Sequence, residues 1–205
     1  MDLPTLILQC AMAVHPETVT AIIQQESGGN PFALNNQVTS FYPETRDEAV
    51  RLLHQALRAG RSTDIGLMQV NSQWLRRLGI EAESLLDPCT NIRVGTWILA
   101  TNYGEAWRRH GAEKPALLAA LSMYNTGSES RGMANGYVGK VTARAGVPLA
   151  PWTGAAGTTK AQANAVPVVH PRAAPTGFAG TGPKRIDAPP ADPLLSHEEA
   201  STPEQ

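Results

Sequence analysis

The sequence lacks the features that would point to a nucleic-acid-binding, membrane-spanning or disulfide-rich protein. Its 205 residues carry 17 basic and 18 acidic side chains, for a net charge of −1. With so little excess charge, we expect no nucleic acid or anionic membrane as a partner. No apolar run reaches the roughly 20 residues that span a bilayer, so no transmembrane segment is predicted. The two cysteines carry no framework pattern, which leaves them open as free thiols or as one bridge.

Motifs for metal, nucleotide and serine-hydrolase chemistry are also missing from the sequence. The five histidines are scattered without the spacing of a metal site. No phosphate-binding loop, dinucleotide fingerprint or G-x-S-x-G elbow occurs. We therefore expect neither a metal nor a cofactor.

The first 13 residues are similar to an export signal peptide only superficially. They contain Asp2, no Lys or Arg, and a very short apolar part. Apolar residues from Leu3 to Cys10 recur at helical spacing, so we expect a short first helix of a folded domain. Two alternatives stay open for export: a leader that this chain lacks, or a route that uses none.

Helical periodicity dominates the chain up to about residue 146. A loop with a short hairpin is expected at residues 30–43, and no stretch shows sustained strand alternation. We therefore predict a mainly α domain at 1–146. The helices are expected at residues 16–26, 46–59, 70–78, 88–109, 115–123 and 137–145.

From residue 147 onward the composition changes to Pro, Ala, Gly and Thr with little periodicity. Such composition is typical of a disordered tail, so we predict a second region at 147–205. The sequence does not decide whether this tail only tethers the domain or binds a partner.

The helix predicted at 16–26 ends in a carboxylate on its apolar face. Val19, Ile22, Ile23 and Glu26 follow the i, i+3, i+4, i+7 pattern of one helical face, and the glycines at 28–29 end the helix. Apolar surroundings and the negative end of the helix dipole both raise the pKa of a carboxyl group. A protonated Glu26 would suit a general acid. The alternative is a solvated or capping glutamate.

Four short segments resemble the lysozyme-like superfamily of goose-type lysozymes and soluble lytic transglycosylases. They are E-S-G-G-N at 26–30, G-L-M-Q-V-N at 66–71, M-Y-N-T-G at 123–127 and G-Y-V at 136–138. Two further segments, at 8–19 and 87–95, are similar to the lytic transglycosylases of type IV secretion and conjugation systems. The resemblance covers about residues 3–146.

The resemblance implies a mainly α, goose-type lysozyme fold with a two-lobed cleft, and peptidoglycan as the substrate. Glu26 matches the single catalytic acid/base of the family. It would protonate the oxygen between N-acetylmuramic acid (MurNAc) and N-acetylglucosamine (GlcNAc), then accept the proton of the muramyl 6-hydroxyl as that oxygen attacks the anomeric carbon. The product is a 1,6-anhydro-MurNAc end. The implied setting is the periplasm, with secretion-system components as partners of the tail.

The other motif residues receive lesser roles from the resemblance. Gly66 would let the backbone approach the sugar, while Met68 and Gln69 would line the cleft. The alternative for Met68 is a place in the core. Cys10 and Cys89 match paired positions of the secretion branch, which implies a disulfide.

In the later motifs, Tyr124 and Asn125 match a sugar-contacting pair, and Tyr137 matches a tyrosine near the catalytic acid. The alternatives are a core position for Tyr124 and an ordinary turn for Asn125. Met123 departs from the Ala or Cys that is frequent there in the family. For Ser27 we expect a local backbone hydrogen bond.

Two other functions stay open at the sequence level. A muramidase that uses water would need a second carboxylate, and Asp64 is the candidate, although Asp in such a place is more often a turn residue. The other alternative is a non-catalytic glycan-binding assembly factor.

Overall fold

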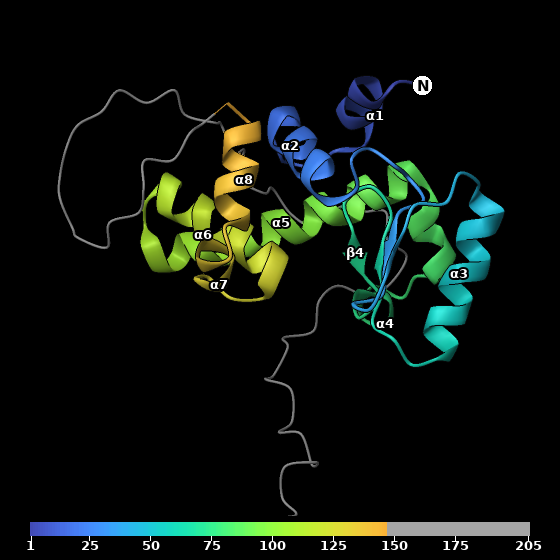
Figure 1. Cartoon of the computed structure of the whole chain (residues 1–205). Helices are drawn as coiled ribbons and strands as arrows, with labels where there is room; N and C mark the ends of the chain where they lie inside the picture. The colour runs from blue at the N-terminus through green and yellow to red at the C-terminus, as the bar shows by residue number, and fades with distance from the viewer. Residues whose placement is uncertain (147–205) are drawn as a thin grey trace, which may run out of the picture. The chain divides into compact units, whose positions relative to one another are not determined.

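The computed structural model describes residues 1–146, and within them helices predominate (Figure 1). This confirms the mainly α fold, while the predicted tail at 147–205 lies outside the described residues. None of the helices in the described part is long and apolar enough to cross a membrane. The helices are α1 (Leu3–Cys10), α2 (Pro16–Glu26), α3 (Arg46–Arg58), α4 (Trp74–Leu78), η1 (Ala82–Leu86), α5 (Pro88–His110), α6 (Glu113–Thr126), α7 (Arg131–Ala134) and α8 (Tyr137–Arg144).

Local sequence explains where several of these helices begin and end. The side chain of Asp87 accepts a hydrogen bond from the Thr90 backbone N–H at 2.8 Å, and a proline follows it at the first helical position of α5. Thr45 caps α3 in the same way. Helix α2 has the predicted bounds, and Gly28 and Gly29 follow it with φ of 63° and 90°, a conformation that favours glycine.

Four two-residue strands form a small antiparallel sheet in the order β2-β1-β3-β4. They are β1 (Leu34–Asn35), β2 (Ser40–Phe41), β3 (Asp64–Ile65) and β4 (Val70–Asn71). The β1–β2 hairpin lies within the predicted 30–43 segment. The helix predicted at 70–78 is wrong at its start, because residues 70–71 pair with β3 and the helix begins only at Trp74.

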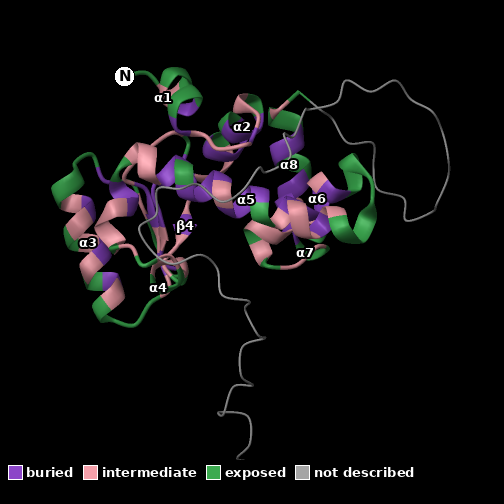
Figure 2. Ribbon diagram, turned by 180° about the vertical axis from the view of Figure 1, so that it is seen from behind, coloured by how far each residue is buried: buried purple, intermediate pink, exposed green. Residues whose placement is uncertain are grey.

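Helix α5 is the central element and contacts both sides of the domain (Figure 1). It packs most extensively against α6 on one side, and it also contacts α1, η1 and β4. Ile92 and Val94 of α5 are fully buried, as are Ile22 and Ile23 of α2. In Figure 2 the buried positions follow α5 and the strands, whereas α3 carries many exposed ones. Helix α2 packs on α8, and together with α6–α8 it forms one wall, the helical wall. The strands form the other, the strand wall, and α5 joins the two.

Cys10 and Cys89 form a disulfide with a Cα–Cα distance of 5.3 Å. The bond ties the end of α1 to the start of α5, 79 residues further along the chain. Closing a loop of that length stabilises a fold by about 4 kcal/mol in the chain-entropy model. The structure therefore confirms the pairing that the family resemblance implied.

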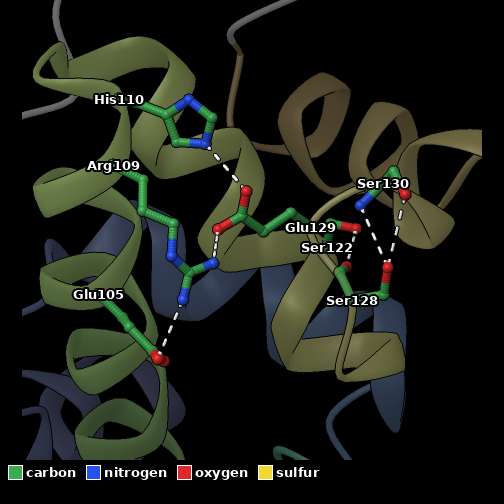
Figure 3. A network of polar contacts seen from close by, with 7 residues as sticks. All are labelled: Glu105, Arg109, His110, Ser122, Ser128, Glu129 and Ser130. Atoms are coloured by element: carbon green, nitrogen blue, oxygen red, sulfur yellow. Dashed lines mark hydrogen bonds and ion pairs between the residues drawn. The ribbon is translucent and has the colours of Figure 1, made fainter.

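A network of polar contacts holds the loop after α6 against the end of α5 (Figure 3). Arg109 pairs with both Glu105 and Glu129, and the Nε2 atom of His110 lies 3.1 Å from the second oxygen of Glu129. The hydroxyl of Ser122 donates to the Ser128 carbonyl at 2.5 Å. Since α6 ends in the M-Y-N-T-G motif, this network fixes the chain directly after it.

Candidate active site

A cavity of about 560 Å³ lies between the strand wall and the helical wall, with Glu26 at its surface. This is the cleft that the fold class predicts. On the strand wall its polar lining includes Ser62, Asp64, Gln69, Asn71 and Gln73, together with the ring of Trp74. On the helical wall the lining includes Asn102, Met123, Tyr124 and Asn125. The cleft therefore collects residues from three of the four sequence motifs.

Glu26 is the last residue of α2, and its carboxyl group is held by a single strong hydrogen bond. The Tyr137 hydroxyl donates to its Oε1 atom at 2.5 Å. Burial raises the pKa of Glu26 to about 7; the hydrogen bond from Tyr137 lowers that pKa, and the charge of Asp64 raises it. The direction is the one that the sequence predicts. Near neutral pH a large fraction of Glu26 therefore carries a proton that it can donate.

The two tyrosines of the later motifs are buried at their hydroxyl groups and stay protonated. Burial and the charge of Glu26 raise the pKa values of both Tyr124 and Tyr137. The Tyr124 hydroxyl donates to the carbonyl of Met68 at 2.8 Å. Tyr137 therefore acts as a donor to Glu26, while Tyr124 joins the helical wall to the loop between β3 and β4.

Ser27 fastens the end of α2 to that same loop. Its hydroxyl contacts the Ile23 carbonyl at 3.2 Å and accepts from the Gly29 N–H at 3.2 Å, which confirms the expected local bonding. It also contacts the Leu67 carbonyl at 2.8 Å, across 40 residues of sequence. The position of Glu26 is thereby linked to the β3–β4 loop.

Asn91 of α5 holds the β3–β4 loop in place by hydrogen bonds, a role that no sequence pattern predicted. It is fully buried, and its amide donates to the carbonyls of Ile65 and Leu85 at 2.7 and 2.8 Å. Its side-chain oxygen accepts from the Met68 N–H at 2.8 Å. The hydrogen-bonding partners of Asn91 are therefore backbone groups of three segments: strand β3, the β3–β4 loop and η1.

In the structure, position 66 requires a glycine for a reason other than contact with a sugar. Gly66 is buried with φ of 76°, and an added Cβ atom would lie 2.3 Å from the amide nitrogen of Asn91. Glycine is therefore required by close packing against Asn91 and by the positive φ. It does not line the cavity, so the expectation that Gly66 brings backbone to the sugar is not met by this geometry.

The expectation that Met68 lines the cleft is wrong. Its side chain is fully buried, and Gly95 of α5 makes the room for it, since an added Cβ there would lie 2.6 Å from the Met68 sulfur. Met68 therefore belongs to the core, the alternative that its residue type also allowed. Its backbone carbonyl, bonded to Tyr124, is what the site uses.

Gln69 and Asn125 lie on opposite walls of the cavity and offer opposite polar groups to it. The Gln69 amide donates to the carbonyls of Ala33 and Gly66 at 3.0 and 2.9 Å, which leaves its side-chain oxygen as an acceptor. The side-chain oxygen of Asn125 accepts from Asn135, which leaves its NH₂ group as a donor. N-acetyl and hydroxyl groups of a sugar provide partners for both.

Asp64 lies on β3, opposite Asn71 of β4, and both line the cavity. The Asn71 amide donates to the Oδ1 atom of Asp64 at 2.7 Å. Burial raises the pKa of Asp64, and this hydrogen bond lowers it. Among the residues described, no group of three or more His, Cys, Asp or Glu side chains could hold a metal ion.

Residues 6–145 match the family described as the Transglycosylase SLT domain. The chain belongs to this family. The match covers nearly all the described residues, including Glu26 and every motif named above.

The relatives extend the resemblance to secretion systems. The chain is 35% identical over 147 residues to "Protein virB1" of Agrobacterium fabrum, covering 71% of this chain and 60% of that protein. It is also 35% identical over 158 residues to "Type IV secretion system protein virB1" of Brucella suis, covering 72% and 66%. A shorter match, 36% identical over 106 residues, joins it to "Invasion protein IagB" of Salmonella typhimurium, covering 48% and 53%. The chain thus spans less than two thirds of the length of these relatives. No solved structure gives a significant match.

Proposed function

We propose that the chain is a peptidoglycan lytic transglycosylase that cleaves the β-1,4 bond between MurNAc and GlcNAc and leaves a 1,6-anhydro-MurNAc end. The observation that carries this proposal is Glu26, a carboxyl group with a pKa of about 7 at the surface of a polar cavity. Membership of the SLT domain family supports the same reaction class.

In the proposed mechanism Glu26 performs both proton transfers. Its proton moves to the bridging oxygen as the bond to the anomeric carbon breaks, and the electron pair leaves with that oxygen. The Glu26 carboxylate, still bonded by Tyr137, then accepts the proton of the 6-hydroxyl as that oxygen attacks the anomeric carbon. No water is consumed, and Glu26 ends the cycle protonated.

The proposed setting is the periplasm, where the enzyme would open the cell wall locally for a type IV secretion or conjugation apparatus. The virB1 relatives support this setting because one group of them is named for a type IV secretion system. A partner for residues 147–205 stays a prediction. Comparing the full chain with a chain that ends at Gly146, for secretion and for binding of apparatus components, tests it.

Digestion of purified peptidoglycan by the wild type and by Glu26→Gln, with mass spectrometry of the muropeptides, tests the reaction. We expect anhydro-MurNAc products from the wild type and at least about a 1,000-fold lower rate from Glu26→Gln. Reducing ends in the wild-type products would instead support a muramidase, the second candidate, which the presence of Asp64 in the same cavity favours. Bound glycan without any products would favour an assembly factor.

A further inference from the structure

A second cavity, of about 470 Å³, lies at the opposite ends of the two helices that carry Glu26 and Tyr137. Glu26 is the last residue of α2 and Tyr137 is the first of α8. The second cavity is lined by the start of α2, the end of α8 and one turn of α1, and α2 lies between the other two helices (Figure 1). The two cavities share no lining residue, so this α1–α2–α8 groove is a separate site.

The α1–α2–α8 groove presents apolar surface to solvent. Its apolar side chains from α1 and α2 are Pro4, Ile7, Leu8 and Pro16. Ile7 is buried, whereas Leu8 is 70% exposed and is one of four exposed large apolar side chains among residues 1–146. The charged residues of the lining, Glu17 and Arg144, are exposed, so their charges stay in water. An apolar segment that covers Leu8 therefore removes apolar surface from water without burying a charge.

The chain itself supplies an apolar segment at the edge of this groove. Gly146 lines the groove and is the last residue that the structure describes. The next six residues, 147–152, read V-P-L-A-P-W, carry no charge and include the only tryptophan beyond residue 146. The residues directly after them, T-G-A-A-G-T-T-K at 153–160, are small or polar. The segment 147–152 therefore matches the groove in polarity, and the residues that follow it do not.

The backbone chemistry of the segment 147–152 also suits an apolar groove. Pro148 and Pro151 have no backbone N–H, so they bring no donor that needs a partner there. Val147 and Ala150 each precede a proline, which favours an extended backbone, and extended proline-rich segments lose little entropy when they dock. Six such residues span about 19 Å. The turn of α1 that lines the groove is about 6 Å long, so the segment is long enough to cross it.

The end of α8 starts this segment on the groove. Gly146 has φ of 72°, and its N–H donates to the Ala143 carbonyl at 3.2 Å. A helix ending of this kind turns the chain back over the last helical turn instead of letting it run on. A segment tethered directly at its site has an effective concentration that is roughly millimolar, so weak contacts are enough to fill the site. A later apolar stretch, V-P-V-V at 166–169, is tethered through a longer linker.

We propose that the α1–α2–α8 groove is the docking site of residues 147–152 of the same chain. Docking there holds the start of the tail on the folded domain, at the ends of α2 and α8 that lie away from Glu26. The cleft is left open, and residues 153–205 extend from the opposite end of these helices. The inference does not depend on the proposed reaction.

Limited proteolysis of the full chain tests the docking. Chymotrypsin cleaves after large aromatic side chains, and beyond residue 146 it has two aromatic sites, Trp152 and Phe178. The variant Leu8→Glu puts a charge in the groove, and Val38→Glu is the matched control, because Val38 is 74% exposed in the loop between β1 and β2. We expect the ratio of cleavage at Trp152 to cleavage at Phe178 to rise about 10-fold in Leu8→Glu and to stay at the wild-type value in Val38→Glu.

Methyl NMR of the full chain gives a second measurement that leaves the groove intact. We expect Trp152→Ala to shift the methyl resonances of Ile7 and Leu8, because the indole ring no longer lies near them, and Phe178→Ala to leave them unchanged. Cleavage ratios that are equal in wild type and Leu8→Glu, with Ile7 and Leu8 resonances insensitive to Trp152→Ala, would overturn the proposal. Resonance shifts that grow with protein concentration would also overturn it, because the groove would then bind a second copy of the chain.

Discussion

The two walls of the cavity hold their polar groups by different means. The helical wall uses phenol hydroxyls and helix ends: Tyr137 begins α8 and reaches Glu26, and Tyr124 reaches the Met68 carbonyl from the last turn of α6. The strand wall uses side-chain amides, because its two-residue strands make few backbone hydrogen bonds. Asn91 donates to the carbonyls of Ile65 and Leu85, and Asn71 donates to the carboxylate of Asp64. The strand wall therefore depends on side-chain amides, and the helical wall depends on two tyrosine hydroxyls.

On the strand side, we expect the largest loss of stability when Asn91 is replaced. We expect Asn91→Ala to lower the free energy of unfolding by about 3 to 5 kcal/mol, because two carbonyls and one N–H lose their partner in the interior. Urea denaturation measures this loss. Asn102→Ala is the matched control: Asn102 lies on the same helix and lines the cavity, and its replacement should change stability by about 0.5 kcal/mol or less. Equal effects of the two changes would contradict the role given to Asn91.

Because Glu26 is buried in the helical wall, we expect the free energy of unfolding to depend on pH. The pKa of Glu26 is about 7 in the folded state against 4.5 in an ordinary setting, so the folded state binds the proton more tightly. Stability is therefore greatest below pH 4.5 and falls as pH rises to 7. At pH 8 we expect Glu26→Gln to be more stable than wild type by about 3 kcal/mol. Denaturation at pH 4 and pH 8 measures the difference, and a gain of equal size at both would contradict this explanation.

Tyr137→Phe tests how the helical wall tunes Glu26. The hydrogen bond from Tyr137 lowers the pKa of Glu26, so its removal should raise that pKa and move the basic limb of the pH–rate profile to higher pH. Tyr124→Phe is the control, because the Tyr124 hydroxyl bonds the Met68 carbonyl instead of Glu26. A shift of the profile in Tyr124→Phe alone would reverse the roles assigned to the two tyrosines.

The smallest effects are expected at the outer ion pairs of each wall. On the helical side Glu129 pairs with Arg109, and on the strand side Glu83 pairs with His54 at 2.7 Å. These side chains are partly exposed, so Glu129→Gln and Glu83→Gln should each cost about 1 kcal/mol or less. Thermal denaturation at low and high salt measures both. If either change lowered the stability more than Asn91→Ala does, the surface ion pairs would stabilise the walls more than the buried amide does.

The helical wall was also the more predictable one. Helix α2 could be predicted to the residue, because Pro16 starts it, an apolar stripe follows, and Gly28 and Gly29 end it. The Glu26 carboxyl was recognisable because it continues that stripe. Residues 70–71 could not be predicted as a strand, because two residues show no alternation and their pairing partner lies elsewhere in the chain.

Individual side chains of the strand wall were harder still to predict. Met68 and Gln69 are neighbours in one motif, yet one is core and the other lines the cavity. A positive φ of 48° at Gln69 turns the chain there, and sequence spacing cannot reveal such a turn. Asn91 was missed because an asparagine inside a helix carries no pattern of its own. Its importance comes from two carbonyls and one N–H that the fold brings to it.

The most direct test of this account is the titration of Glu26 itself. Carbon-13 NMR of the glutamate side-chain carboxyl groups in the full chain, with the Glu26 resonance assigned from Glu26→Gln, gives its pKa without any substrate. We predict a midpoint near 7, because burial and the charge of Asp64 raise the pKa of Glu26 more than the hydrogen bond from Tyr137 lowers it. A midpoint near 4.5 would contradict it, because Glu26 would then be ionised at neutral pH with no proton to donate.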